Sequence, residues 1–119
     1  MWVIKRAYEP AEKEDGLRVL VDRLWPRGMK KEDLSLDEWK RAVSPSPALR
    51  KWFNHDLSRW EEFQQRYRQE LEANPSAWNG LFQAGQAEKV TLLFSARDAQ
   101  HNSALVLKEF LEMRLQKER

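Results

Sequence analysis

Two almost continuously apolar segments constrain the fold of this chain most strongly. Residues 17–21 (Leu-Arg-Val-Leu-Val) are interrupted only by Arg18, and residues 90–97 begin with Val-Thr-Leu-Leu-Phe. A strand that is apolar at successive positions is covered on both faces, as in the parallel sheets of α/β proteins. Helical patterns separate and follow these segments. We therefore expect a single α/β domain over residues 1–119, a small three-layer domain with a mainly parallel central sheet flanked by helices.

Two weaker patterns predict further strands. Residues 2–8 are short and β-prone, and their connection to residues 17–21 is so short that either a parallel or an antiparallel pair is open. Residues 38–47 alternate in polarity and then meet two prolines, which favours a strand ending in a turn. The Ser-Leu-Asp-Glu segment at 35–38 is a rival signal, because it can start a short helix as a capping box. We expect residues 28–37 to form a charged loop.

The expected helices lie mostly in the second half of the chain. A short helix suits the residues after Pro47, and a longer one precedes Asn74. Pro75 then opens a helix that we expect to stop at Gly85. A last helix occupies the C-terminal part. Two apolar stripes at helical spacing support this interpretation: Trp60, Phe63, Tyr67 and Leu71, then Ala104, Leu107, Leu111 and Leu115.

Polar side chains follow the end of the second, third and last expected strands. In open α/β sheets, ligands bind beyond the carboxyl ends of the strands, where helix N-termini also point. We therefore expect these side chains to lie at one edge of the sheet and to line one ligand site. They are Asp22, Arg23, Trp25 and Arg27 after residues 17–21, Ser44 and Ser46 after the third strand, and Ser95, Arg97, Asp98, His101 and Asn102 after the last.

The chemistry of this set favours an anionic ligand. Planar guanidinium groups give paired donors, and a helix N-terminus adds free N–H groups and partial positive charge, which together suit a phosphate or a carboxylate. An imidazole near neutral pH can act as acid, base or donor. We predict that Asp22, Ser95 and His101 are the polar or acid–base groups and the candidate catalytic residues. The predicted ligand-binding residues are Arg23, Trp25, Arg27, Ser44, Arg97 and Asn102.

Each of these features also has a purely structural explanation. Asp22 and Arg23 can pair separately with other charges, because neighbours on a strand point to opposite faces. Trp25 can be a hydrophobic lid, and Asp98 can be a helix N-cap. His55, the other histidine, lies beside aromatic residues and suits local capping or packing better than chemistry.

Composition and missing motifs narrow the chemistry further. The chain has 21 basic and 19 acidic residues, a net charge of +2, which argues against non-specific nucleic-acid binding as its main activity. It has no cysteine, which excludes disulfides and thiolate chemistry and fits a cytoplasmic protein. Its two histidines form no metal-ligand motif and no recognised triad spacing with Ser95, and its four glycines form no phosphate loop. We therefore expect no metal, no cofactor and, since no segment is long and apolar enough, no membrane insertion.

Four motifs, in order, cover nearly the whole chain. They are residues 15–28, ending in Val-Asp-Arg-Leu-Trp-Pro-Arg-Gly, residues 39–56, beginning Trp-Lys-Arg-Ala-Val-Ser-Pro-Ser-Pro, the Trp60, Phe63, Tyr67 spacing followed by Glu70-Leu71, and residues 90–111. Together these motifs resemble the YeaO-like branch of domain-of-unknown-function family 488 (DUF488). The resemblance implies a compact α/β domain without an established biochemical activity.

Longer members of that family are similar in having an Asp-Val-Arg-type strand end where this chain has Val21-Asp22-Arg23. They also carry a Cys-His-Arg-type element that would fall near His101. This chain has Gln-His-Asn there and no cysteine anywhere. The comparison therefore excludes a cysteine-based phosphatase or sulfurtransferase mechanism for this chain.

Two functions fit these residues. The one we favour is binding of a small anionic ligand, such as a nucleotide or a phosphorylated metabolite, at the C-terminal edge of the sheet. The alternative is a non-catalytic interaction module that contacts nucleic acid or a protein partner through the same arginines and Trp25. A concave site with converging arginines would favour the first, and a flat basic or aromatic surface would favour the second.

Overall fold

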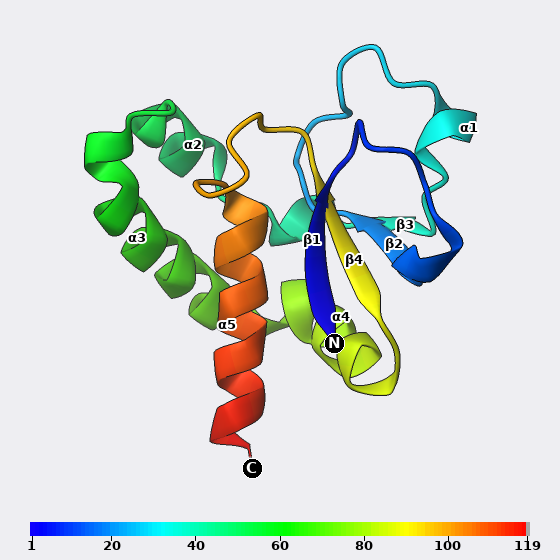
Figure 1. Ribbon diagram of the computed structural model, residues 1–119. Helices are drawn as coiled ribbons and strands as arrows, with labels where there is room; N and C mark the ends of the chain where they lie inside the picture. Colours follow the sequence, from blue (N-terminus) through cyan, green and yellow to red (C-terminus); the bar gives the residue numbers. More distant parts are fainter. Residues whose placement is uncertain (119) are drawn as a thin grey trace.

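A four-stranded sheet and five α-helices make up the fold in the computed structural model, which describes residues 1–118 (Figure 1). The strands are β1 (Trp2–Arg6), β2 (Leu17–Leu20), β3 (Glu38–Trp39) and β4 (Val90–Phe94). The α-helices are α1 (Lys31–Leu34), α2 (Pro47–Phe53), α3 (Trp60–Ala73), α4 (Pro75–Ala87) and α5 (Ser103–Lys117). Short 3-10 turns span Lys13–Asp15 (η1), Arg41–Val43 (η2) and Leu57–Arg59 (η3). Among residues 1–118, no helix combines the length and apolar character that crossing a bilayer requires.

The strand order is β1-β4-β2-β3, and every neighbouring pair is parallel. β4, the last strand in the chain, lies between the first two. The sequence left open whether β1 and β2 pair in parallel or antiparallel. The two strands do not pair with each other, and each of them pairs in parallel with β4. The register pairs Arg6 with Phe94 and Leu20 with Leu93, so all three strands end at the same edge.

Both faces of β4 are covered, as its continuous apolar sequence predicts. Val90, Leu92 and Phe94 belong to a large core built with side chains of α2, α3, α4 and α5. Leu93 faces a smaller core with Leu20 and Leu34, closed by the partly buried side chains of Trp25, Met29, Leu36 and Trp39. The predicted α/β class with a parallel central sheet is confirmed. The bulk of the helices covers one face, and α1 with its loops covers the other (Figure 1).

Four local predictions need correction. The strand expected within residues 38–47 is only Glu38–Trp39, because the chain then turns into η2 and buries Val43 in the large core. The capping-box interpretation of residues 35–38 is wrong, since Ser35 is the left-handed C-cap of α1, with φ of 50°. That one-turn helix lies inside the segment expected to be a charged loop. α4 continues past Gly85 to Ala87.

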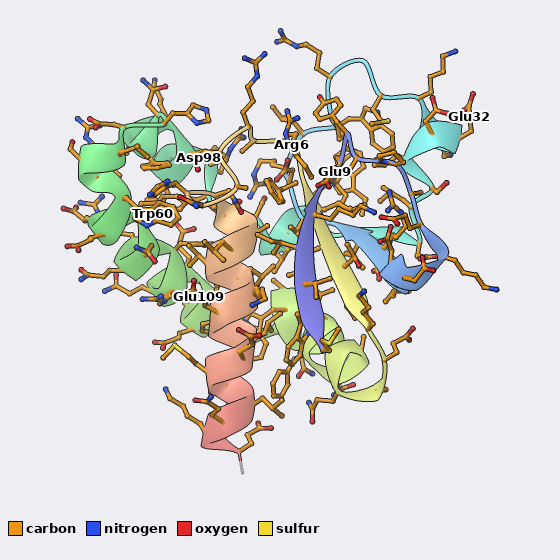
Figure 2. All side chains as sticks on the ribbon, in the orientation of Figure 1. Arg6, Glu9, Glu32, Trp60, Asp98 and Glu109 are labelled. Carbon is orange, nitrogen blue, oxygen red and sulfur yellow. The ribbon has the colours of Figure 1, made fainter. Side chains whose placement is uncertain are left out.

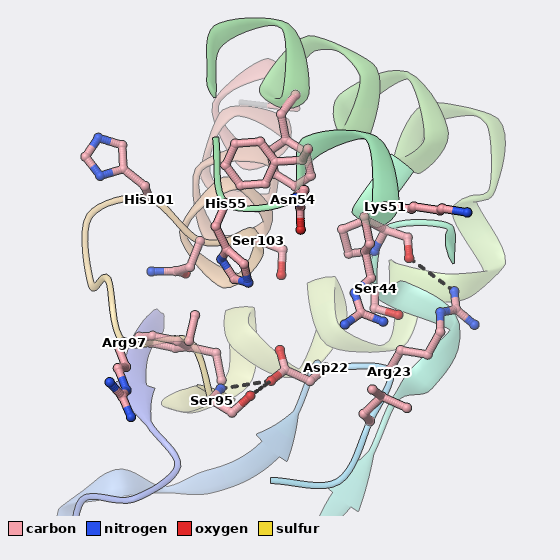
Figure 3. Close-up of a pocket in the computed structure, with 18 of the residues that line it drawn as sticks. Asp22, Arg23, Ser44, Lys51, Asn54, His55, Ser95, Arg97, His101 and Ser103 are labelled. Carbon is pink, nitrogen blue, oxygen red and sulfur yellow. Dashed lines mark hydrogen bonds between the residues drawn. The ribbon is translucent and has the colours of Figure 1, made fainter. Parts of the chain in front are cut away.

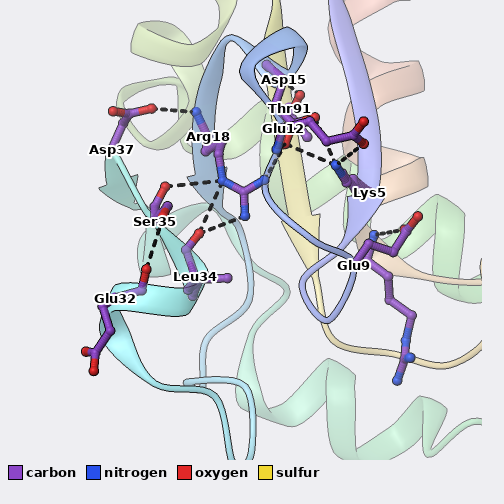
Figure 4. A network of polar contacts seen from close by, with 11 residues as sticks. Lys5, Glu9, Glu12, Asp15, Arg18, Glu32, Leu34, Ser35, Asp37 and Thr91 are labelled. Atoms are coloured by element: carbon purple, nitrogen blue, oxygen red, sulfur yellow. Dashed lines mark hydrogen bonds and ion pairs between the residues drawn. The ribbon is translucent and has the colours of Figure 1, made fainter.

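A buried polar network on the face opposite the large core holds β2 to its neighbours (Figure 4). Arg18, only 4% exposed, donates to the Asp15 carboxylate and, at 2.7 Å, to the Leu34 carbonyl. Lys5 donates to the same carboxylate at 3.0 Å. Burial alone would raise the pKa of Asp15, but the Glu12 backbone N–H together with Lys5 and Arg18 outweighs burial and lowers it. The only interruption of the apolar run at 17–21 is thus the residue that joins β2, η1 and α1.

Gly85 lies inside α4 because the ring of Trp2 occupies the space of a side chain there. A Cβ atom built on Gly85 would lie 2.1 Å from the nearest Trp2 ring atom, whereas one on Gly80 would meet only Lys40, at 3.5 Å. We expect Gly85→Ala to lower the free energy of unfolding by about 1–3 kcal/mol through overpacking. Gly80→Ala in the same helix should instead raise the free energy of unfolding by about 0.5–1 kcal/mol, and urea denaturation measures both changes. Equal effects of the two substitutions would contradict this packing.

Candidate functional site

A cavity of about 1090 Å³ opens at the edge of the sheet where β1, β2 and β4 end (Figure 3). Segments that follow these strands form one side of it, and α2 and the start of α5 form the other. All nine residues predicted as catalytic or ligand-binding line this one cavity: Asp22, Arg23, Trp25, Arg27, Ser44, Ser95, Arg97, His101 and Asn102. Ser46 and Asp98, which the sequence also placed at this edge, are not among its lining residues. The structure therefore brings the predicted set together, and the role of each member follows from its contacts.

The charge of the cavity differs sharply from that of the chain. Six cationic side chains line it, Arg6, Arg23, Arg27, Arg50, Lys51 and Arg97, against one carboxylate, Asp22. Within the described chain, none of the six forms an ion pair. Five arginines outside the cavity are each paired with a carboxylate: Arg18, Arg59, Arg66, Arg68 and Arg114. Arg41, also outside the cavity, has no carboxylate partner in residues 1–118 and instead stacks over the Trp39 ring. The cavity itself thus gathers, around one hollow, six cations without an ion-pair partner in the described chain.

Asp22 and Ser95 form the polar floor of the cavity, directly beyond the paired ends of β2 and β4. The Ser95 backbone N–H and hydroxyl both donate to Asp22 Oδ2, each at 2.8 Å (Figure 3). The Trp39 indole donates to the Asp22 carbonyl at 2.7 Å and fixes the backbone. Burial raises the pKa of Asp22, and this effect exceeds the opposing effects of the Ser95 donors and of Arg50.

Two of the cations are held in place by backbone carbonyls. Arg6 donates to Ala96 O at 3.0 Å and to Ser95 O at 3.3 Å, and its guanidinium stacks over the Tyr8 ring. Arg23 donates to Pro45 O at 3.3 Å, while its Nε is buried and has no hydrogen-bond partner in residues 1–118. Carbonyl contacts position these groups and leave their positive charge uncompensated.

Three predicted ligand-binding residues use their polar atoms to build the walls. The buried Asn102 side chain caps α5 by accepting from Leu105 N at 2.8 Å, and it donates to Asp98 O. Ser44 Oγ donates to Arg41 O at 2.6 Å. The Trp25 indole donates to the Met29 carbonyl and its ring packs against Trp39 in the smaller core, as expected of a hydrophobic lid. Asn102 and Ser103 thus place the N-terminus of α5, the end of a helix that carries partial positive charge, at the cavity wall.

His101 lines the rim, but its ring is occupied elsewhere. Nδ1 lies 2.8 Å from Asp98 Oδ2, and the ring meets Trp60 edge-on at 5.2 Å between centroids. Asp98 and Trp60 lie beside each other near the start of α5 (Figure 2), and the imidazole is turned away from Asp22 and Ser95 (Figure 3). The backbone N–H of Gln100 and His101 itself lower the pKa of Asp98. Ser95 and His101 therefore do not form a nucleophile–base pair.

Sequence reasoning missed four cavity residues that carry or can carry positive charge: Arg6, Arg50, Lys51 and His55. Arg6 ends β1, so the strand-end rule applied to the first strand would have found it. Arg50 and Lys51 come from α2, whose return across the strand ends is a tertiary feature. His55 follows Asn54, and both have positive φ values, 58° and 46°. Such a conformation is costly for non-glycine residues and often marks functional sites. Within residues 1–118, no three His, Asp or Glu side chains gather closely enough to hold a metal ion.

The raised pKa of Asp22 predicts a pH-dependent gain in stability on removal of its charge. A carboxyl with a raised pKa in the folded protein stabilises the fold while protonated, and this contribution is lost as the pH rises through that pKa. Asp22→Asn should therefore raise the melting temperature at neutral pH, and the gain should vanish below the ordinary Asp value of 3.8. Thermal unfolding at a series of pH values, from below the ordinary Asp pKa to neutral, measures this difference in melting temperature. Asp33→Asn in α1 is the matched control and should change little; a neutral-pH loss in Asp22→Asn would contradict the prediction.

Comparison with known proteins places the chain in a family. A family model described as the inactive DUF488-N3 subclade matches residues 1–119. The chain is 45% identical over 107 residues to the uncharacterized protein YeaO of Escherichia coli K12, covering 90% of this chain and 93% of YeaO. It is 37% identical over 111 residues to the uncharacterized protein Rv3073c of Mycobacterium tuberculosis H37Rv, covering 93% of each chain. The uncharacterized protein Mb3100c of Mycobacterium bovis matches with the same identity and coverage.

No solved structure shows a significant match to this chain. The family model covers the whole chain, and the relatives are aligned over nearly their entire length. These matches confirm the resemblance carried by the four sequence motifs. The chain belongs to the DUF488 family, within the part described as the inactive DUF488-N3 subclade.

Proposed function

We propose that this chain, acting as one domain in the cytoplasm, binds a small anionic ligand in the cavity at the C-terminal edge of its sheet. The ligand class is a nucleotide or another phosphorylated metabolite. The observation that carries the proposal is the set of six cations without ion-pair partners around one hollow. Like charges gathered in this way repel one another, and a bound phosphate or carboxylate relieves the repulsion while accepting guanidinium hydrogen bonds.

Shape favours a small ligand over a macromolecular partner. The arginines and Trp25 line a concave space of about 1090 Å³, slightly above the roughly 300–1,000 Å³ that ligand pockets occupy. An interaction module would present the same side chains on a flat surface. The hollow, in addition, ends at the N-terminus of α5, where backbone N–H groups favour anions.

Binding without turnover is the simpler form of this proposal. The subclade to which the chain belongs is described as inactive. His101 pairs with Asp98, so its imidazole does not act on the Ser95 hydroxyl, which donates to Asp22 instead. In this proposal Asp22 and Ser95 contact the ligand as polar groups, and His101 shapes the rim.

Screening by thermal shift against mononucleotides and sugar phosphates tests the proposal. We expect a saturable rise in melting temperature for at least one of these phosphates, because a ligand that binds only the folded state stabilises it. Arg27→Ala and Arg97→Ala should each weaken binding by about 10- to 100-fold, the effect of losing one charge-assisted hydrogen bond. Arg114→Ala, which removes the same charge outside the cavity, is the matched control and should leave the affinity unchanged.

Two outcomes would overturn the proposal. One is the lack of saturable stabilisation by any phosphate in the panel. The other is an equal loss of affinity in Arg97→Ala and in the control Arg114→Ala, which would indicate general charge attraction. Binding to single-stranded nucleic acid with a steep salt dependence, without small-ligand binding, would instead support the interaction module.

A further inference from the structure

A carboxylate at the floor of a cationic cavity needs an explanation of its own. An anion bound near Asp22 is repelled by it, so this side chain weakens the binding of any ligand that offers only negative charge. Asp22 is nonetheless the single acidic side chain among the lining residues. Its contacts show what it is arranged to do.

One oxygen of Asp22 is fixed and the other is free. Oδ2 accepts both Ser95 donors at 2.8 Å, which sets the orientation of the carboxylate. Oδ1 has no hydrogen-bond partner in residues 1–118. It is also accessible to solvent, because the only side-chain polar atoms in these residues that are both buried and without a partner are Arg23 Nε and Arg68 Nε. In Figure 3 the free oxygen is turned toward the side of the cavity where Ser103 lies.

The surrounding cations leave Oδ1 available. No ion pair joins Asp22 to any of the six cationic side chains in the described structure. Arg6 and Arg23, which flank the strand ends, donate instead to the carbonyls of Ser95, Ala96 and Pro45. The cavity thus contains an oriented, unused hydrogen-bond acceptor inside a ring of positive charge.

We propose that Asp22 Oδ1 accepts a hydrogen bond from a neutral hydroxyl group of the ligand, so that the site selects hydroxylated phosphates over simple anions. This inference rests on the proposed function and specifies its ligand class. A neutral donor fits because a ligand ammonium would be repelled by the six cations, whereas a hydroxyl meets only the carboxylate. Ser95 is the positioning residue, since its two donors hold the acceptor toward the cavity.

Two phosphates of similar size and equal charge separate the alternatives. Ribose 5-phosphate carries hydroxyl donors, and phenyl phosphate has none apart from its phosphate. In isothermal titration calorimetry, the unaltered protein should bind ribose 5-phosphate about tenfold or more tightly than phenyl phosphate. This factor corresponds to one hydrogen bond to a charged group. Asp22→Asn keeps the Ser95 contact through its amide oxygen and turns an N–H donor toward the cavity. It should weaken the binding of ribose 5-phosphate, strengthen the binding of phenyl phosphate and bring the ratio of the two affinities close to one.

Control variants make the result specific to Asp22. Ser95→Ala removes the hydroxyl donor but keeps the backbone N–H donor, so it loosens the carboxylate and should reduce the preference in the same direction by a smaller factor. Asp33→Asn makes the same chemical change on α1, away from the cavity, and should leave the ratio unaltered. Asp22→Asn is expected to be at least as stable as the unaltered protein, and its melting temperature checks that a change in ligand preference does not result from misfolding.

The outcomes separate this inference from the proposal beneath it. If both phosphates bind and Arg97→Ala weakens both, but Asp22→Asn leaves their ratio unchanged, the role of Asp22 is refuted while anion binding stands. If neither phosphate nor any member of the thermal-shift panel binds the unaltered protein, anion binding fails and the inference fails with it. A lost preference in Asp22→Asn, combined with an unchanged ratio in Asp33→Asn, supports the inference.

Discussion

The parallel register between β2 and β4 is the constraint on which the site depends. Leu20 pairs with Leu93, so the chain leaves both strands at the same level and Asp22 lies beside Ser95. A slip of one residue would turn Val19 from the large core to the opposite face and would separate Asp22 from its two donors. The core enforces the register because apolar side chains on both faces of the sheet would be misplaced by any slip. The packing that forms the sheet, the contacts of Ser95 and the Trp39 indole bond to the Asp22 carbonyl therefore together orient the carboxylate at the cavity floor.

Arg18 strengthens this register from the other face. Its guanidinium reaches Asp15 and the Leu34 carbonyl, and those partners exist at one position along β2. A shifted strand would carry the charge into the apolar core beside α5, where an unpaired guanidinium is strongly destabilising. The single charged residue in an otherwise apolar strand thus selects one alignment, while Val19 and its apolar neighbours supply most of the burial. The strand is fixed by packing on one face and by a buried ion pair on the other.

Local sequence patterns predicted the sheet edge well because parallel topology makes that edge a necessity. Once residues 17–21 and 90–97 are parallel strands, whatever follows them must share one rim, and Arg23 and Arg97 do. Such patterns did not predict which strands are neighbours in the sheet. β4 lies between β1 and β2, and no local signal indicates that a strand more than 70 residues away along the chain inserts there. The direction of the His101 ring was also unpredictable, since it depends on Trp60 from another helix. Strand ends were predictable, and contacts between distant elements were not.

Net charge was the most misleading quantity in the sequence, because it averages two different populations of cations. Five arginines outside the cavity are each paired with a carboxylate, as Arg68 is with Glu109. The cavity cations are not, and they divide further: Arg6 and Arg23 are fixed by carbonyls, whereas Arg27 and Arg97 are exposed to solvent. Water and salt screen the exposed pair, which limits the cost of self-repulsion in the empty site. A ligand that displaces this water restores the full attraction of the outer cations while the inner ones are already in position. A chain with a net charge of +2 can in this way hold a strongly cationic cavity.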